Sequence, residues 1–296
     1  MQYRVALFAA TFAASTLVSA CTSSQSTTTE QSASPTGSAA AAVSVVASTG
    51  ASASPGAAGT PVSYTDLVGV PGAEMMTNVA SLGVFGMPTG TFNPSGTITR
   101  GDFVKWLVLA NNAIFASEPD KVIRPSQSTT SSYPDVTTTD PNFSYIQGMY
   151  DAGFAVGFPD KTFKPSDLLT REQMIAIKES IDRGGVVKYY VNFSDSLLPN
   201  WKDKAQINKL FRGAIAEDYS KDRDAMKQGR ADLVIDNVPR VFGGLAMLRP
   251  QQPVTRAQAA LVVWKIGAHS DKVLNALPSD VPRSAADALA SATATP

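Results

Sequence analysis

The sequence predicts a mainly α-helical protein built from three tandem helix–loop–helix units. Three observations predict it: one short motif recurs three times, each copy carries the signals of a helix start, and the flanking stretches show helical apolar spacing. The motif is an apolar residue, any residue and a proline, followed by a Thr-Arg pair that begins seven residues after the apolar one. Its copies occupy residues 92–100, 163–171 and 248–256. Such recurrence is typical of a repeat protein whose units pack on one another.

Each copy of the motif ends in a predicted helix N-terminus. Thr99, Thr170 and Thr255 fit the N-cap position, because a threonine hydroxyl accepts a hydrogen bond from a first-turn N–H group. The residue three positions later can bond back to the cap and complete a capping box. These residues are Asp102, Gln173 and Gln258, of which the short Asp102 is the least suited.

Helix capping does not explain the arginine that follows each threonine. Arg100, Arg171 and Arg256 fall at the first helical position, where the helix dipole mildly disfavours a cation. A local rule that is broken in the same way three times suggests another role. The three arginines are therefore the leading candidate binding residues.

Helices are expected on both sides of each loop. The first unit, residues 63–117, should have helices at 75–82 and after Thr99. The inward face of the latter is predicted from its spacing as Phe103, Trp106, Leu107, Ala110 and Ile114. The second unit, residues 132–185, should have a helix near 143–150 and another that ends at Gly184-Gly185.

The third unit, residues 190–268, is longer than the others. Asp195, interpreted as its opening aspartate, lies 60 positions before Thr255, whereas the corresponding spacings in the other units are 33 and 35. The difference predicts an insertion of about 25 residues. The inserted part near 217–240 is rich in Lys, Arg and Asp, which is typical of a solvated helix and loop. It is also a candidate contact for a protein partner.

The ends of the chain predict export and disorder. Residues 1–20 have the basic start, apolar run and small residues of a signal peptide, and 18–21 resemble the lipobox of bacterial lipoproteins, which would make Cys21 the lipidated residue. All but seven of residues 22–62 are Ser, Thr, Ala, Gly or Pro, so 21–62 should be a disordered linker. Residues 269–296 should form a low-complexity tail.

Composition excludes several classes of site. The 25 basic and 25 acidic residues give a net charge of zero, so no global field favours nucleic acid. A single cysteine excludes an intrachain disulfide, and a single histidine argues against a histidine metal site or a Ser-His-Asp triad. No cofactor or metal is expected.

The repeating unit resembles the S-layer homology domain. The likeness spans residues 63–268 and is strongest in the second copy, through Tyr133, Asp135, Gly153, Gly157, Asp160, Phe163, Pro165 and residues 169–172. The resemblance implies that the three copies form a pseudo-threefold helical spindle, with grooves in which the arginine of the Thr-Arg pair meets anionic cell-wall glycan.

Carried over by position, the resemblance nominates Arg100, Arg171 and Arg256 as glycan-binding residues. Weaker nominations are Asp66, Asp135, Asp195, Gly86 and Gly157. A guanidinium suits this role because it can hold a carboxylate with two parallel hydrogen bonds, and a helix start is expected to add free N–H donors nearby.

The resulting hypothesis is a non-catalytic, lipid-anchored protein of the bacterial cell envelope. It would tether a membrane, through lipid on Cys21, to peptidoglycan or an associated anionic wall polysaccharide. Two alternatives remain open. One is a wall hydrolase that uses paired carboxylates such as Asp135 and Asp160. The other is a subunit of a surface-layer assembly, although no large assembly region besides the repeats is visible.

Overall fold

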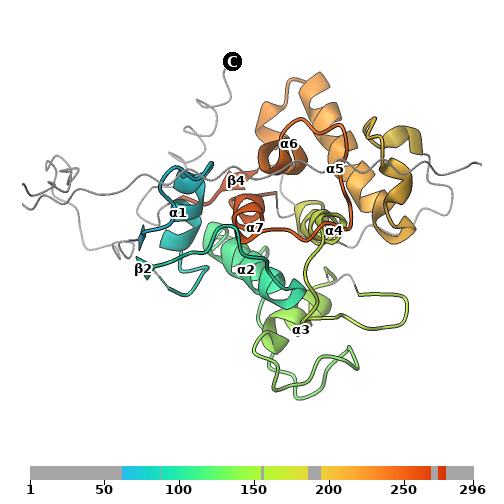
Figure 1. Ribbon diagram of the computed structural model, residues 1–296. Coiled ribbons are helices and arrows are strands. Elements are labelled where there is room, and N and C mark those ends of the chain that lie inside the picture. The colour runs from blue at the N-terminus through green and yellow to red at the C-terminus, as the bar shows by residue number, and fades with distance from the viewer. Residues whose placement is uncertain (1–61, 88, 155–156, 186–194, 268–272, 278–296) are drawn as a thin grey trace, which may run out of the picture. The chain divides into compact units, whose positions relative to one another are not determined.

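The computed structural model describes residues 62–87, 89–154, 157–185, 195–267 and 273–277. The expected signal peptide, its candidate lipidation residue Cys21 and nearly all of the expected linker and tail lie outside these ranges. The described residues form a mainly helical structure, as the sequence predicts, with a few short strands (Figure 1).

The first two units each contain two helices. These are α1 (Ala73–Ser81) and α2 (Arg100–Ile114) in the first unit, and α3 (Phe143–Asp151) and α4 (Arg171–Asp182) in the second. The strands β1 (Ser63–Tyr64) and β2 (Thr89–Gly90) pair in parallel in the first unit. Both units therefore have the predicted helix–loop–helix order.

The third unit has additional helical elements. It contains α5 (Lys209–Lys227), α6 (Asn237–Phe242) and α7 (Arg256–Val263), together with three 3₁₀ turns, at Asp195–Leu197, Lys204–Gln206 and Ala231–Leu233. The antiparallel strands β3 (Lys265–Ile266) and β4 (Leu274–Asn275) follow. The described part of the chain contains no helix that is both long enough and apolar enough to cross a bilayer.

The predicted helix caps are present. Thr99 accepts a hydrogen bond from the backbone N–H of Asp102 at 3.1 Å. Thr170 and Thr255 form complete capping boxes, with Gln173 and Gln258 bonding back to the cap. Asp102 is too short for this return bond and instead accepts one from the Thr99 hydroxyl at 2.8 Å.

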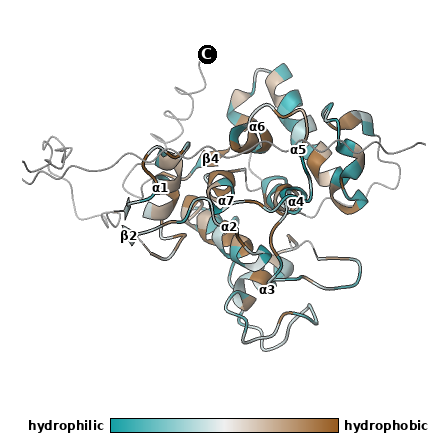
Figure 2. Ribbon diagram, in the orientation of Figure 1, coloured by the Kyte–Doolittle hydropathy of each residue, from teal (hydrophilic) through white to brown (hydrophobic). Residues whose placement is uncertain are grey.

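The three capped helices, α2, α4 and α7, contact one another at the centre of the described structure (Figure 1). All five residues predicted for the inward face of α2 are buried. In Figure 2, α7 is largely apolar, whereas the outer helix α5 alternates between apolar and polar residues. This contrast fits a helix buried on several sides and a helix with one solvated face.

The third unit adds a second apolar core, which includes Phe211, Ala214 and Ile215 of α5. Every residue of α4 except Gln173 is buried. One side of α4 packs with Met174 and Ile177 into the main core, and the other packs with Ile175 and Ala176 against α5. Within residues 217–240, Asp218, Ile235 and Asn237 are the buried residues and the others are exposed or partly exposed, so most of the expected insertion contacts solvent.

Candidate functional site

The three arginines of the Thr-Arg pairs link each unit to the next. Each guanidinium donates a hydrogen bond to the backbone carbonyl of the apolar residue that opens the motif in another unit. These bonds join Arg100 Nε to Phe163, Arg171 Nη1 to Leu248 and Arg256 Nε to Phe92, over 2.8, 2.9 and 2.8 Å. The first unit thus bonds to the second, the second to the third, and the third back to the first.

Backbone groups repeat the same cyclic pattern. In the first unit, the N–H groups of Arg100 and Gly101 donate to the carbonyls of Asp167 and Pro165 in the second, both over 2.9 Å. Equivalent pairs of bonds leave the starts of α4 and α7. Because the threonine cap accepts from the third N–H group, the expectation of free N–H donors at these helix starts is wrong.

Aspartates hold the turns that receive these bonds. Asp66 accepts from the backbone N–H groups of Phe92 and Asn93 over 2.8 and 2.7 Å. Asp135 accepts from Phe163 and Lys164 over 2.9 and 2.7 Å. The bonds from Phe92 and Asn93 lower the pKa of Asp66, with the Phe92 N–H contributing most.

The corresponding residue of the third unit is Asp203, so the assignment of Asp195 as its opening aspartate is wrong. Asp203 accepts from the N–H groups of Leu248 and Arg249 over 2.9 and 2.7 Å. Asp195 instead pairs with Arg212 at 2.9 Å. The signal was present in the sequence, because Trp201 precedes Asp203 by two positions, as a tyrosine precedes each of the other aspartates.

This correction also shortens the insertion. Asp203 lies 52 positions before Thr255, which is 19 and 17 more than in the first and second units. The extra length consists of the C-terminal part of α5 together with Ala231–Leu233 and α6. Trp201 lies before the 3₁₀ turn at Lys204–Gln206.

In each turn that donates two N–H groups to an aspartate, the second donor residue has an unusual backbone conformation. Asn93, Lys164 and Arg249 have φ angles of 58°, 60° and 54°. This left-handed region costs a non-glycine residue roughly 1–2 kcal/mol. It also forms part of the backbone geometry that turns successive N–H groups toward one anion. The aspartate is therefore the internal anion that stabilises the turn.

The three guanidinium groups differ in their access to solvent. Arg100 has an exposed fraction of 0% and lies over the rings of Phe158 and Phe163, whose centroids are 4.9 and 4.7 Å from its Cζ. Burial lowers the pKa of Arg100 to about 10, which leaves it charged at neutral pH. Arg171, 7% exposed, lies 4.4 Å from the centroid of the Phe242 ring.

Arg256 is the most accessible of the three. Its side chain is half-buried, and its Cζ lies 5.0 and 4.8 Å from the ring centroids of Phe92 and Trp106. Burial lowers its pKa, whereas attraction by Asp102, Tyr64 and Asp66 opposes this shift. No hydrogen bond joins either of its Nη atoms to the described part of the chain. This guanidinium therefore lies over two aromatic rings and has two donor nitrogens available to a ligand.

The two nominated glycines play different local roles. Gly86 is exposed, with φ of 78° and nothing close to where a Cβ would lie. At Gly157 a Cβ would lie 2.6 Å from Cε1 of Tyr133. The second glycine thus permits close packing against the opening tyrosine.

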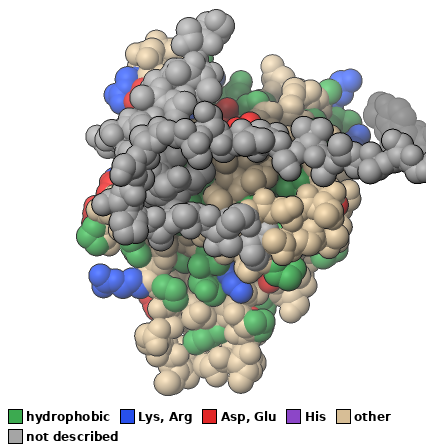
Figure 3. Space-filling model, turned by 90° about the vertical axis from the view of Figure 1, so that its left-hand side faces the viewer, with side chains coloured by type: hydrophobic (Ala, Val, Ile, Leu, Met, Phe, Trp, Pro, Cys, Tyr) green, Lys and Arg blue, Asp and Glu red, His purple; other side chains and the backbone are tan. Residues whose placement is uncertain are grey.

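The described residues form no cluster of His, Cys, Asp and Glu suited to a metal ion. Figure 3 shows basic and acidic side chains scattered over the described part of the face on which α1 lies. The candidate site is therefore the half-buried Arg256 with Tyr64, Asp66, Phe92 and Trp106, at the junction of the third and first units.

Comparison with known families agrees with this geometry. Residues 63–104 and 132–175 match the S-layer homology domain. The chain is therefore similar to this domain in two segments, which together cover less than half of its length. They include the opening aspartates Asp66 and Asp135 and the arginines Arg100 and Arg171, whereas Leu248 and Arg256 lie outside them.

Two curated proteins are similar to part of the chain. A cellulosome-anchoring protein of Acetivibrio thermocellus is 26% identical over 149 residues, which cover 48% of this chain and 30% of that protein. An endoglucanase of a Bacillus species is 24% identical over 195 residues, which cover 63% of this chain and 17% of the enzyme. The matches thus span less than a third of the length of either relative.

Proposed function

We propose that the protein is a non-catalytic cell-envelope tether that binds peptidoglycan or an associated anionic wall polysaccharide through S-layer homology repeats. Its two matched repeats and its similarity to a protein named for cellulosome anchoring support wall binding or anchoring. The structural observation that carries the proposal is the Arg256 guanidinium, half-buried on an aromatic floor with both Nη atoms available.

The ligand of this site is an acidic glycan group. A guanidinium can bind a carboxylate with two parallel N–H bonds, and Arg256 is held in place by its Nε bond to Phe92. The ring centroid of Tyr64 lies 5.5 Å from that of Phe92, and the carboxylate of Asp66 attracts the guanidinium. Arg100 and Arg171 serve first as links between units, because their side chains are buried.

The third unit acts as a diverged copy of the same repeat. It retains the capping box at Thr255, the held turn with Asp203, and the arginine bond to the next unit. These contacts support a ring of three units in which the third provides the accessible arginine. We therefore propose that the groove of the third unit binds the ligand.

The membrane end of the tether is proposed to be lipid on Cys21. This proposal rests on residues 18–21 alone, which lie outside the described structure. In a membrane fractionation, the unaltered chain should sediment with membranes, whereas Cys21→Ser should not. A Cys21→Ser chain that remains with membranes after removal of the cell wall would contradict lipid anchoring.

Wall binding can be tested separately from lipid anchoring. The full-length chain with Cys21→Ser should co-sediment with purified cell walls, and the added change Arg256→Gln should weaken this binding about tenfold through loss of a charged hydrogen-bond donor. Arg124→Gln, at an exposed arginine outside the ring, is the matched control and should bind normally. Equal binding of the two variants would contradict the role of Arg256. Removing acidic polymers from the walls distinguishes polysaccharide from peptidoglycan as the ligand.

The similarity to an endoglucanase favours an enzyme as the second candidate. The pair Asp135 and Asp160 is poorly suited to hydrolysis, because Asp135 is occupied by two backbone N–H groups. Hydrogen bonds from Thr162 lower the pKa of Asp160, whereas a general acid needs a raised one. Release of soluble wall fragments by the purified chain, lost on Asp160→Asn, would nevertheless establish the enzyme.

A further inference from the structure

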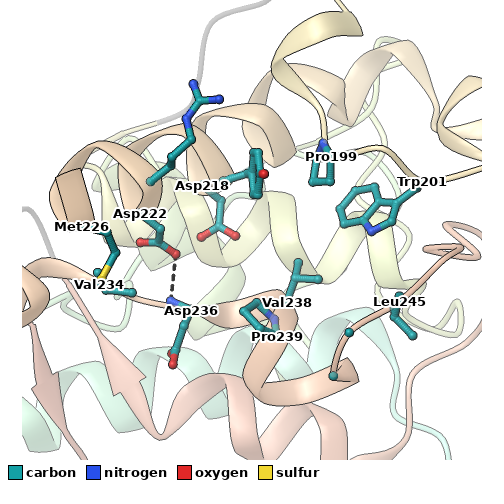
Figure 4. Close-up of a pocket in the computed structure, with 14 residues that line it drawn as sticks. Pro199, Trp201, Asp218, Asp222, Met226, Val234, Asp236, Val238, Pro239 and Leu245 are labelled. Atoms are coloured by element: carbon teal, nitrogen blue, oxygen red, sulfur yellow. Dashed lines mark hydrogen bonds between the residues drawn. The ribbon is translucent and has the colours of Figure 1, made fainter. Parts of the chain in front are cut away.

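The insertion of the third unit forms a pocket away from the arginine ring. Its volume is about 450 Å³, and it lies among α5, α6 and the segments around residues 199–201 and 243–245 (Figure 4). None of the three ring arginines or their carbonyl partners lines it. A pocket of this size can enclose a small organic molecule or one long side chain.

Asp218 provides a buried carboxylate in this pocket. It is 3% exposed, and its Oδ1 atom accepts a hydrogen bond from the Asn237 amide at 3.1 Å. No hydrogen bond to Oδ2 is present among the described residues. In Figure 4, Asp218 and Asp222 project from α5 side by side toward the segment that contains Asp236 and Val238. Because Asp218 lines the pocket, this oxygen is available to a hydrogen-bond donor of a bound molecule.

Asp222, the neighbouring acid, already has its partners. It accepts from the backbone N–H groups of Ile235 and Asp236, both at 2.8 Å, and Arg183 lies 3.3 Å away. It therefore helps to fold the segment after α5 back onto the helix. Asp218 remains the acid with an oxygen available to a ligand.

Acidic residues outnumber basic ones in the lining of the pocket, which contains Asp218, Asp222 and Asp236 but only Arg223 as a base. Lys178 is paired with Asp182 at 2.5 Å, and Arg183 with Glu179 at 3.0 Å, so α4 is internally balanced. Asp218 and Asp222 add two further acids from α5. Beyond α6, Asp236 pairs with Arg240 at 3.0 Å and with Lys265 at 3.8 Å. Burial, together with repulsion from Asp222 and Asp182, raises the pKa of Asp218 to about 7.

The remaining walls of the pocket are mostly apolar. They include Trp201, Val238, Pro239 and Leu245, together with the half-exposed Tyr219. Arg223 is the basic residue of the lining, and its Cζ lies 5.8 Å from the centroid of the Tyr219 ring. Aromatic faces and apolar walls around a buried carboxylate are suited to a cation that carries an apolar body.

We propose that this pocket binds an organic cation, whose ammonium group donates a hydrogen bond to Oδ2 of Asp218 while its apolar body packs against Trp201 and Leu245. A neutral apolar molecule would bury the carboxylate without a donor, and an anion would be repelled by the excess acids. A cation supplies both the donor and the opposite charge. This inference goes beyond wall binding, because it uses no residue of the arginine ring.

The proposal can be tested by calorimetric titration of the full-length chain with two molecules of similar shape. The probe is 2-phenylethylammonium, and the neutral control is 2-phenylethanol. The cation should bind about tenfold more tightly than the alcohol, as expected for a hydrogen bond between charged groups. Equal affinities, or no binding of the cation at millimolar concentrations, would overturn the proposal.

Variants locate the binding to the pocket. Asp218→Asn keeps the size and the acceptor for Asn237, and it should abolish the preference for the cation. Asp224→Asn, on the same helix but outside the pocket lining, should leave it unchanged. Tyr219→Ala removes a half-exposed wall and should weaken binding while the fold is retained, which circular dichroism checks. A preference for the cation that survives Asp218→Asn would place the binding elsewhere and overturn the assignment.

Proton release provides an independent readout. A bound cation favours the ionised form of Asp218, so binding near pH 7 should release protons into the buffer. Titrations in buffers of different ionisation enthalpy measure this release. The release should be absent in Asp218→Asn and present in Asp224→Asn. Cation binding without any proton release near pH 7 would contradict contact with Asp218.

Discussion

Arg256 donates a hydrogen bond to the carbonyl oxygen of Phe92, 164 positions earlier in the chain, over 2.8 Å. This bond closes a ring in which each unit holds the motif of another. Because all three bonds use the arginine after a capping threonine, one residue links the start of a helix to the turn of a neighbouring unit. The same residue therefore links the units and, where it is accessible, is proposed to bind the ligand.

Replacing Arg100 by methionine should destabilise the protein by about 2–4 kcal/mol. The change removes a buried charged donor and leaves the carbonyl of Phe163 without it, while methionine roughly fills the space between the two aromatic rings. Urea unfolding measures the loss, and Arg124→Met is the exposed control. Equal stability of the two variants would show that the Arg100 bond contributes little.

Asp203→Asn should lower the free energy of unfolding by about 1–3 kcal/mol, because two backbone N–H groups lose a charged acceptor. Asp195→Asn should change it by less than about 0.5 kcal/mol, since that surface pair with Arg212 is partly solvated. Thermal and urea unfolding of both variants distinguish the two assignments of the opening aspartate. If Asp195→Asn were the more destabilising change, the assignment of Asp195 as the opening aspartate would be supported instead.

Arg249→Gly should stabilise the protein by roughly 0.5–1 kcal/mol. Glycine adopts the left-handed conformation of this turn without the steric cost that arginine pays at φ of 54°. Burial lowers the pKa of Arg171 and repulsion from Arg249 adds to this shift, so the change also removes the smaller of the two causes. Arg124→Gly is the control, because residue 124 is not among those with positive φ and should gain nothing. Destabilisation by Arg249→Gly would indicate that the side chain makes a contact that outweighs the strain.

Stability should fall as pH rises from about 4 to about 7. The pKa of Asp218 is raised from its ordinary value of 3.8 to about 7 by burial, so its neutral form is favoured in the folded state. A raised folded-state pKa means that the contribution is fully present below the unfolded pKa and is lost as pH approaches 7. Burial also raises the pKa of Glu179, which acts in the same direction.

The measurement for this pH dependence is urea unfolding at pH 5 and pH 8. The free energy of unfolding should be higher at pH 5 by roughly 1–3 kcal/mol, and Asp218→Asn should reduce the difference. Asp224→Asn is again the matched control on α5. A rise in stability from pH 5 to pH 8 in the unaltered chain would contradict the buried neutral form of Asp218.

The sequence was sufficient for features that depend on near neighbours. Thr99, Thr170 and Thr255 cap helices through groups three positions away, and the apolar face of α2 follows from helical spacing. Both are properties of a short segment. The repeated turn could also be recognised, although its aspartate in the third unit was assigned to Asp195 rather than Asp203.

The roles of the arginines and of the inserted charges required the tertiary structure. A solvated insertion and a buried one have the same composition, and only the packing of α5 on α4 shows that Asp218 is enclosed.

By itself, the sequence determined the three units, their helix starts and the unusual position of Arg100, Arg171 and Arg256. Tertiary structure alone decided what those arginines contact, because their carbonyl partners lie 63, 77 and 164 positions away. Capping is settled within one helical turn, whereas burial of a guanidinium depends on which surfaces meet when the units close into a ring.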